Sequence, residues 1–338
     1  MSPFGRRLRA LGSRVAEPVM VGLVRALFAG LRALGPERSS DLGGRIARTF
    51  GRLVPAHRTA LANVRAAYPG AEEAFVRRIV EGAWDNLGRT AGEYAHLSAL
   101  FDYDPDAPAP GRVEVIGIEH FLRLRDDGRP ALIFSAHLGN WELPAICAAR
   151  FGLDATAVFR APNDRAVAQV IQEVRRETMG GLEAARPGAA FAMQGVLERG
   201  GHLGMLVDQH FTRGVVVPFM GRPALVNPVM GKFARRFDCP VHGVRVVRLP
   251  GHRFRLELTP PLALPRDAAG EIDPAGAMRA MTEVVEGWVR EHPEQWLWMH
   301  RRWRPAMLPA TPPRDAQPNV TSVAVPEAPK VETPTVTP

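Results

Sequence analysis

The sequence predicts an α/β fold in which a mixed, mainly parallel sheet is flanked by helices. Between residues 111 and 213, short apolar runs alternate with helical stretches. The apolar runs show no polar alternation, which is typical of strands buried on both faces of a sheet. A composition of 46% hydrophobic and 23% charged residues allows a sizeable core and excludes a wholly disordered chain.

Residues 1–38 form the first predicted unit, a basic amphipathic or membrane-anchoring helix. Residues 1–65 carry twelve arginines against three acidic residues, a net charge of +9, while the whole chain carries only +8. A basic arm on a near-neutral body suggests an anionic surface as partner. Since the body lacks zinc-finger spacing and an aromatic RNA-binding signature, we expect a membrane surface and no nucleic acid.

The apolar stretch 18–34 places Arg25 and Arg32 seven residues apart, on one face of a helix. The opposite face is apolar and holds Leu23, Leu27, Phe28, Leu31 and Leu34. This pattern favours a helix lying in the plane of a membrane interface. A spanning helix is the alternative, although two central arginines count against it. In both cases the body stays in the cytoplasm.

Residues 39–307 form the predicted main domain, which starts with helices over residues 40–100. Strands and helices then alternate, and two further apolar runs, PVHGVRVVRL and RFRLELTPPL, predict a strand pair. AGAMRAMTEVVEGWVREHP predicts the last helix. Residues 308–338 contain eight prolines and predict a disordered tail. Cys147 and Cys239 lie in apolar surroundings and are expected to be buried free thiols in a reduced compartment.

The most informative segment is ALIFSAHLGNWELPAICAAR, residues 131–150. A buried strand leads into His137, a turn at Gly139 and a new helix, with Asn140 as its expected N-cap. In open α/β sheets, ligands bind beyond the carboxyl ends of the strands. Because Gly139 breaks the helix, His137 and Glu142 can meet. Glu142 would then fix the imidazole tautomer, and His137 would accept a proton from a hydroxyl. A histidine that merely caps a helix remains the alternative.

HLGNWE resembles the H-x4-D/E signature of the glycerolipid acyltransferases, and more narrowly that of the lipid A biosynthesis acyltransferase family. Further blocks match that family in order over residues 45–305: NVRAAYP, WDNLGRTAGEY, VFRAPND, RRETMGG, LVDQ, VVVPFMGRPA and PEQWLWMHRRW. The resemblance implies a glycerol-3-phosphate-acyltransferase-like fold. It also implies a location on the cytoplasmic face of the inner membrane of Gram-negative bacteria.

The resemblance implies transfer of a fatty acyl group from acyl-acyl carrier protein to the 3-hydroxyl of a hydroxyacyl chain on a lipid A precursor. His137 would deprotonate that hydroxyl, and Glu142 would orient His137. The thioester is already activated, so no cofactor and no covalent enzyme intermediate are expected, which agrees with the lack of a GxSxG elbow. An acceptor that is another glycolipid or a lysophospholipid stays open.

Further residues are candidates for substrate binding. Arg176, or its neighbour Arg175, would bind a lipid phosphate or stabilise an oxyanion, unless both simply end a helix. Asp208 ends a buried strand and would pair with an active-site arginine, or form a plain turn. The remaining candidates are Arg160, Asn140 and Gln209. Phe219, Gly221 and Pro223 are expected in a pocket wall or an ordinary loop.

The C-terminal block PEQWLWMHRRW combines Trp296, Trp298 and Trp303 with three basic residues. This mixture suits a bilayer interface or a phosphorylated sugar, and equally a final core segment with a basic edge.

Two function classes remain as alternatives. A metal-dependent hydrolase could use His137, Glu142, Asp208 and His210, although HExxH is missing and we expect no metal. A catalytically inactive membrane scaffold is the other.

Overall fold

The computed structural model describes residues 3–107, 109, 111–160, 164–186 and 188–303. The predicted tail lies outside these residues. The chain begins with helices α1 (Pro3–Leu34), α2 (Pro36–Gly51), α3 (Pro55–Ala67) and α4 (Glu73–Glu93), then the short η1 (Tyr94–His96) and α5 (Leu97–Leu100). The helical interpretation of residues 40–100 is therefore confirmed.

Strands and helices then alternate as the apolar runs predicted. The elements are β1 (Val113–Ile116), α6 (Ile118–Asp126), β2 (Ala131–Ser135), α7 (Leu143–Arg150), β3 (Ala155–Phe159), α8 (Arg165–Thr178), β4 (Gly181–Ala184), α9 (Ala189–Glu198), β5 (His202–Leu206), β6 (Val215–Phe219), β7 (Arg222–Val226), α10 (Val229–Phe237), β8 (Val241–Leu249), β9 (Arg253–Leu258), α11 (Pro274–Glu291) and η2 (Pro293–Gln295).

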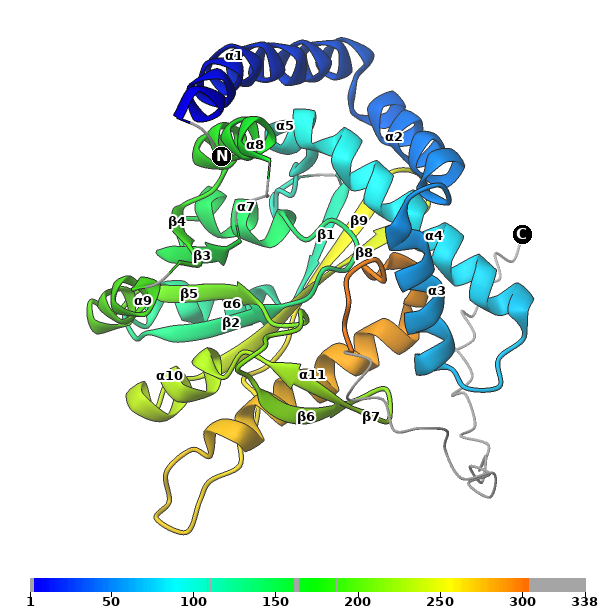
Figure 1. The fold of residues 1–338 in the computed structure, drawn as a ribbon. Coiled ribbons are helices and arrows are strands. Elements are labelled where there is room, and N and C mark those ends of the chain that lie inside the picture. The colour runs from blue at the N-terminus through cyan, green and yellow to red at the C-terminus, as the bar shows by residue number, and fades with distance from the viewer. Residues whose placement is uncertain (1–2, 108, 110, 161–163, 187, 304–338) are drawn as a thin grey trace, which may run out of the picture.

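Seven strands form one sheet in the order β1-β9-β8-β2-β5-β3-β4 (Figure 1). All neighbouring pairs are parallel except β8 and β9, which form the predicted strand pair and run antiparallel. The mixed, mainly parallel sheet flanked by helices is confirmed. β2 and β5 lie side by side in its centre, so the segments that follow them leave the sheet at the same edge.

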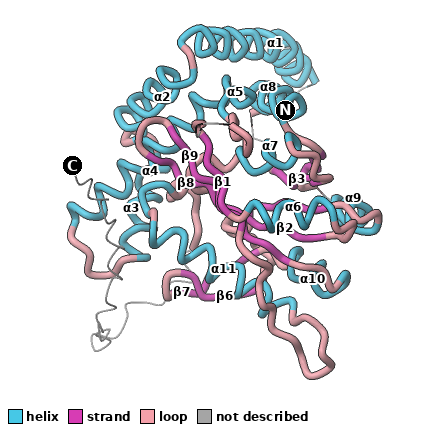
Figure 2. Tube along the Cα trace, turned by 180° about the vertical axis from the view of Figure 1, so that it is seen from behind, coloured by secondary structure: helices cyan, strands magenta, loops and turns pink. Residues whose placement is uncertain are grey.

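Side chains of the central strands alternate between two cores. In β2, Leu132 and Phe134 belong to the core shared with α3, α4, α9, α10 and α11, whereas Ala131 faces the core shared with α5, α6 and α7. The helices therefore cover both faces of the sheet (Figure 2). Burial on both faces explains why these strands are continuously apolar.

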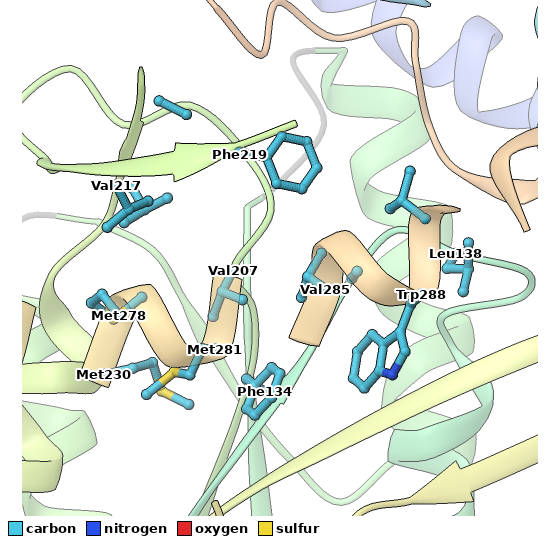
Figure 3. Close-up of a cluster of buried hydrophobic side chains, with 14 of the residues drawn as sticks. Phe134, Leu138, Val207, Val217, Phe219, Met230, Met278, Met281, Val285 and Trp288 are labelled. Carbon is cyan, nitrogen blue, oxygen red and sulfur yellow. The ribbon is translucent and has the colours of Figure 1, made fainter. Parts of the chain in front are cut away.

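Helix α11 presents one apolar side to the sheet, as Figure 3 shows for Met278, Met281, Val285 and Trp288. The Trp288 ring stacks on Phe134 of β2 with ring centroids 5.6 Å apart. This packing fixes the last helix beneath β2 and brings the C-terminal segment back to the loop that follows this strand.

The segment VVVPFMGRPA forms a separate two-stranded hairpin of β6 and β7. Met220 and Gly221 connect its strands with φ angles of 53° and 70°, as a tight hairpin turn requires. Phe219 is fully buried against Trp296 and Trp303. The segment is therefore a packed hairpin, and its Phe219 belongs to the core instead of a pocket wall.

Helix α1 packs on α8 through Val21, which meets Ala166 and Val170. Phe28 also faces the body, so the five apolar residues predicted on one free face divide between two sides. Leu23 and Leu27 are 60% and 61% exposed. None of the helices in the described ranges combines the length and apolar character needed to span a bilayer.

Candidate active site

His137 lies on a tight loop between β2 and α7. Gly139 in this loop has φ = 57°, and a Cβ at this position would lie 2.2 Å from the backbone oxygen of Val246. A glycine is required for both reasons. The predicted break at Gly139 is confirmed, and Pro144 occupies the first turn of α7.

Asp208 is the carboxylate partner of His137. Ser135 of β2 pairs with Leu206 of β5, and His137 and Asp208 each follow two residues later at the same sheet edge. Asp208 Oδ1 lies 2.8 Å from His137 Nδ1, and its Oδ2 accepts a hydrogen bond from the His137 backbone N–H at 2.8 Å. The expected position of Asp208 at this edge is confirmed. The expected pairing of Asp208 with an arginine is wrong.

The neighbours of His137 fix its tautomer. An ionised carboxylate only accepts hydrogen bonds, so Nδ1 carries the proton that faces Asp208. The Gln209 side-chain amide lies 3.2 Å from Nε2 and can donate to it. Nε2 therefore holds a lone pair, and the side chain, 14% exposed, borders an open cleft. This is the state that a general base needs.

The C-terminal block PEQWLWMHRRW binds Asp208 and the loop that carries His137 through hydrogen bonds. The Trp296 indole N–H donates to Asp208 Oδ2 at 2.7 Å. The Leu297 N–H donates to the His137 oxygen at 3.1 Å, and the Gly139 N–H donates to the Gln295 oxygen at 3.2 Å. Trp296, Trp298 and Arg302 are at most 1% exposed. The core-segment interpretation of the block is confirmed for these residues.

The charge on Asp208 is well supported although its side chain is fully buried. Burial opposes ionisation, but His137 and the donors around the carboxylate hold the pKa of Asp208 well below its usual value. Nearby His300 is different, because burial lowers its pKa to about 4 and keeps it neutral at pH 7. The site thus combines a fixed negative charge with an imidazole that faces the cleft.

Glu142 is not the carboxylate partner of His137. Its carboxylate receives two hydrogen bonds from Arg175, from Nε at 3.0 Å and from Nη2 at 2.6 Å, and a third from the Tyr94 hydroxyl. Glu142 is 4% exposed. The predicted His137–Glu142 contact is therefore corrected, because Arg175 and Tyr94 hold the carboxylate while Asp208 occupies Nδ1.

The structure also shows which of the two neighbouring arginines, Arg175 or Arg176, lies at the site. Arg175 is the inward residue, with a side chain 13% exposed, whereas Arg176 is exposed at the surface of α8. The preference for Arg176 is therefore corrected in favour of Arg175 as the arginine at the site. Arg160 is exposed and borders the cleft next to His137.

Asn140 lies in a second buried network beneath the loop. Its amide nitrogen donates to Glu93 Oε2 at 2.9 Å, and its oxygen accepts from the Glu142 N–H at 3.2 Å. Arg248 binds both oxygens of Glu93 at 2.5 and 3.0 Å. Asn140 is therefore a structural residue, and Glu142 instead of Asn140 occupies the N-cap position of α7.

No pattern in the sequence indicated a role for Tyr94, Glu93 or Arg248, and the interpretation of Trp296 did not include a contact with Asp208. Tyr94, Glu93 and Trp296 lie in blocks that carried the family resemblance, which was the available signal. Arg248 and Glu93 are 155 residues apart in sequence, so no local pattern joins them.

Three cavities meet at Trp141, whose ring centroid lies 5.2 Å from that of His137. The His137 cleft has a volume of about 630 Å³ and contains Arg160, Arg175 and Gln209. The inner pocket, about 110 Å³, lies between the sheet and helices α7 and α8 and is lined by small and apolar residues such as Ala148, Ala157, Gly204 and Met205. The helix groove, about 490 Å³, lies among α1, α2 and α4.

Metal ligands do not gather here. Within the described ranges, no three His, Cys, Asp or Glu side chains form a group that could hold a metal ion. The four residues of the hydrolase alternative are divided, since Glu142 binds Arg175 and Asp208 binds His137. Cys147 and Cys239 are buried free thiols as predicted, and burial raises the pKa of Cys147 to about 12.

Comparison with known proteins decides the family. The sequence model of the bacterial lipid A biosynthesis acyltransferases matches residues 12–305. The chain belongs to this family. This acyltransferase is 28% identical over 285 residues to the lipid A biosynthesis myristoyltransferase of Escherichia coli (strain K12), covering 81% of this chain and 83% of that relative.

Two further relatives are similar to this acyltransferase. Lipid A biosynthesis acyltransferase 1 of Shigella flexneri is 28% identical over 81% of this chain and 83% of its own length. Lipid A biosynthesis acyltransferase 2 of Shigella flexneri is 25% identical over 82% of this chain and 87% of its own length.

Proposed function

We propose that this acyltransferase moves a fatty acyl group from acyl-acyl carrier protein to a hydroxyl of a lipid A precursor, with His137 as general base. The family and the names of the relatives support lipid A acylation. The observation that carries the mechanism is the Asp208–His137 pair at the edge of the cleft. Asp208 takes the orienting role that the sequence had given to Glu142.

In the proposed reaction, His137 Nε2 takes the proton of the acceptor hydroxyl as its oxygen attacks the thioester carbonyl carbon. The tetrahedral intermediate then collapses, the carbon–sulfur bond breaks, and the imidazolium returns the proton to the departing thiolate. An ester and a free acyl carrier protein thiol result. Asp208 stabilises the imidazolium without taking its proton. Since the thioester is an activated donor, we propose that no cofactor is needed.

The inner pocket is the proposed site of the donor acyl chain. It starts beside Trp141 and extends between helices α7 and α8 and the sheet face of β2, β3 and β5, where Ala148, Ala157 and Gly204 leave space. An apolar pocket stabilises an alkyl chain by about 0.8 kcal/mol per buried methylene group. Arg160 and Arg175 on the cleft side are the proposed contacts for anionic groups of the substrates, with Gln209 beside the reacting hydroxyl.

We further propose that the enzyme works at the cytoplasmic face of the inner membrane. Helices α1 and α2 and the loop after α2 carry large exposed apolar side chains: Val19, Met20, Leu23, Leu27, Leu34, Leu42, Ile46, Phe50, Leu53 and Val54. Arg38, Arg45, Arg48 and Arg52 are interspersed among them. Apolar side chains flanked by arginines suit a surface that lies in a bilayer interface.

The test is transfer of a labelled acyl group from acyl carrier protein to a lipid A precursor by His137→Ala. We expect a loss of about 10²-fold to 10⁴-fold. His292→Ala, which removes a half-buried histidine at the end of α11, is the matched control and should retain wild-type transfer. Unchanged transfer by His137→Ala would contradict the mechanism. Preference for a lysophospholipid acceptor in the same assay would contradict the proposed substrate.

A further inference from the structure

The helix groove is an apolar channel that the proposed mechanism has not used. Its walls come from α1, α2, α4 and α8, and its lining residues include Leu27, Leu31, Ile46, Leu87, Ala91 and Ile171. A volume of about 490 Å³ falls in the usual range for ligand sites.

The floor of the groove is backbone. Helices α2 and α4 cross so closely that a Cβ on Gly43 would lie 2.1 Å from the Gly88 oxygen. A Cβ on Gly92 would lie 2.2 Å from the Ser39 oxygen. Larger residues at these positions would separate the helices, so the glycines hold the two walls together and leave the channel open beside them.

The two ends of the groove connect different parts of the molecule. Its outer end contains Leu27, Leu42 and Ile46, which are 61%, 39% and 49% exposed and belong to the proposed membrane-facing surface. Its inner end contains Tyr94 and Trp141. Since Trp141 also borders the inner pocket and the His137 cleft, the groove leads from the proposed membrane side to the base.

The chemistry of the lining indicates an alkyl chain. The lining contains two hydroxyl groups, and both are already used inside the protein: Thr90 donates to the Gly139 oxygen at 3.2 Å, and Tyr94 donates to Glu142. A bound peptide would leave its backbone N–H and C=O groups without partners here, which costs free energy. A hydrocarbon chain has no such groups.

We propose that the helix groove binds the hydroxyacyl chain of the acceptor lipid and delivers its hydroxyl to His137 from the membrane side. This inference rests on the proposed function. The reaction joins two alkyl chains at one ester, and Trp141, which lies beside His137, borders two apolar cavities as well as the His137 cleft. With the donor chain in the inner pocket, the groove is the matching channel for the acceptor.

The first test fills the groove with Ala91→Phe. Ala91 is exposed on α4 and borders the groove, so the new ring displaces the lipid chain without disturbing the core. Each methylene group lost from an apolar site weakens binding about fourfold, so two displaced groups raise the acceptor KM roughly 15-fold. The KM for acyl-acyl carrier protein and the activity toward a soluble acceptor with a short hydroxyacyl chain stay unchanged.

Ala190→Phe is the matched control, because it adds the same ring to an exposed position of α9, outside the groove. It should retain wild-type kinetics. An unchanged KM of Ala91→Phe for the long-chain acceptor overturns the inference, and so does an equal loss with the short-chain acceptor.

A second measurement separates the inference from the proposed function. A lipid A precursor with a photoactivatable diazirine near the end of its hydroxyacyl chain is crosslinked to His137→Ala, and the labelled peptides are identified. Label in α1, α2 and α4 supports the groove as the binding site of the acceptor chain, even if the wild type transfers nothing. The absence of transfer would overturn only the proposed function. If the wild-type enzyme is active but the label is confined to residues of the inner pocket, the groove assignment is overturned and the proposed function is not.

Discussion

Two buried carboxylates flank the same short loop, and they have different partners. Asp208 faces an imidazole, whereas Glu142 faces a guanidinium and a phenol. Both are at most 4% exposed, and each accepts three hydrogen bonds from the described residues.

The difference lies in what each partner can do near neutral pH. An imidazole gains and loses a proton in this range, whereas a guanidinium remains charged. Only Asp208 can therefore influence a proton transfer directly. Glu142 holds Arg175, which borders both the inner pocket and the cleft, and Tyr94, which borders the helix groove. In the proposed mechanism, Asp208 therefore supports the proton transfer, whereas Glu142 supports the shape of the site.

The largest loss of unfolding free energy is expected from breaking the hydrogen bonds of Glu142 with Arg175 and Tyr94. Glu142→Ala leaves the Arg175 charge without its carboxylate, and removal of one partner of a buried pair costs about 3–5 kcal/mol. Urea unfolding would measure this loss of free energy. The double variant Glu142→Leu, Arg175→Met should recover most of it, because an apolar pair of similar volume needs no charge partner.

Glu73→Ala is the control for that experiment, since it removes an ion pair with Arg65 in which both side chains are about half exposed. It should leave stability unchanged. A Glu142→Ala variant as stable as Glu73→Ala would show that the Glu142 network is not what holds this side of the loop.

The sequence predicted the elements of this site better than their partners. The strand before His137, the break at Gly139 and a carboxylate at the end of residues 202–206 all follow from local patterns. That β5 lies directly beside β2 is set by the order of strands, which no local pattern contains. Spacing alone therefore favoured Glu142, five residues from His137, over Asp208, 71 residues away.

Long-range contacts also explain the other missed features. The role of Trp296 depends on α11 bringing the C-terminal segment to Leu138, with which Trp296 forms an isolated β-bridge. The helix groove depends on the packing of α1 against α8, which the apolar pattern of residues 18–34 could not indicate. The pattern predicted a helix here, as the structure shows, but it did not indicate which apolar residues face the body.

A smaller effect is expected from removing one donor to Asp208. Trp296→Phe keeps the ring and deletes the indole N–H, a hydrogen bond to a charged group of the kind that contributes about 1.5–3 kcal/mol. We expect kcat to fall roughly 10-fold to 100-fold with little change in either KM. Steady-state kinetics would measure this.

Trp298→Phe is the matched control, because the Trp298 indole donates to the Pro293 oxygen and not to Asp208. An equal loss of kcat in both variants would assign Trp296 a packing role only.

The smallest effect is a change of stability with pH that is due to His300, the imidazole that stays neutral near Asp208. Burial lowers its pKa to about 4, so between pH 4 and pH 6.5 the unfolded chain binds the proton and the folded chain does not. Stability therefore rises with pH in this window. Lowering the pH from 7 to 5 should cost roughly 1–2 kcal/mol of unfolding free energy. His300→Asn should lose less over the same step, and an equal loss would contradict the assignment.

The most direct test compares the pH–rate profiles of Asp208→Asn and Glu142→Gln, each measured per folded enzyme. An asparagine amide can donate to Nδ1 and so favours the wrong tautomer of His137, which should lower kcat about 10³-fold to 10⁴-fold. Glu142→Gln should keep the acidic limb of the wild-type profile and most of its kcat. Two results together would contradict the Asp208–His137 pair as the catalytic base. These are a shift of the acidic limb of the pH–rate profile in Glu142→Gln and a wild-type pH–rate profile in Asp208→Asn.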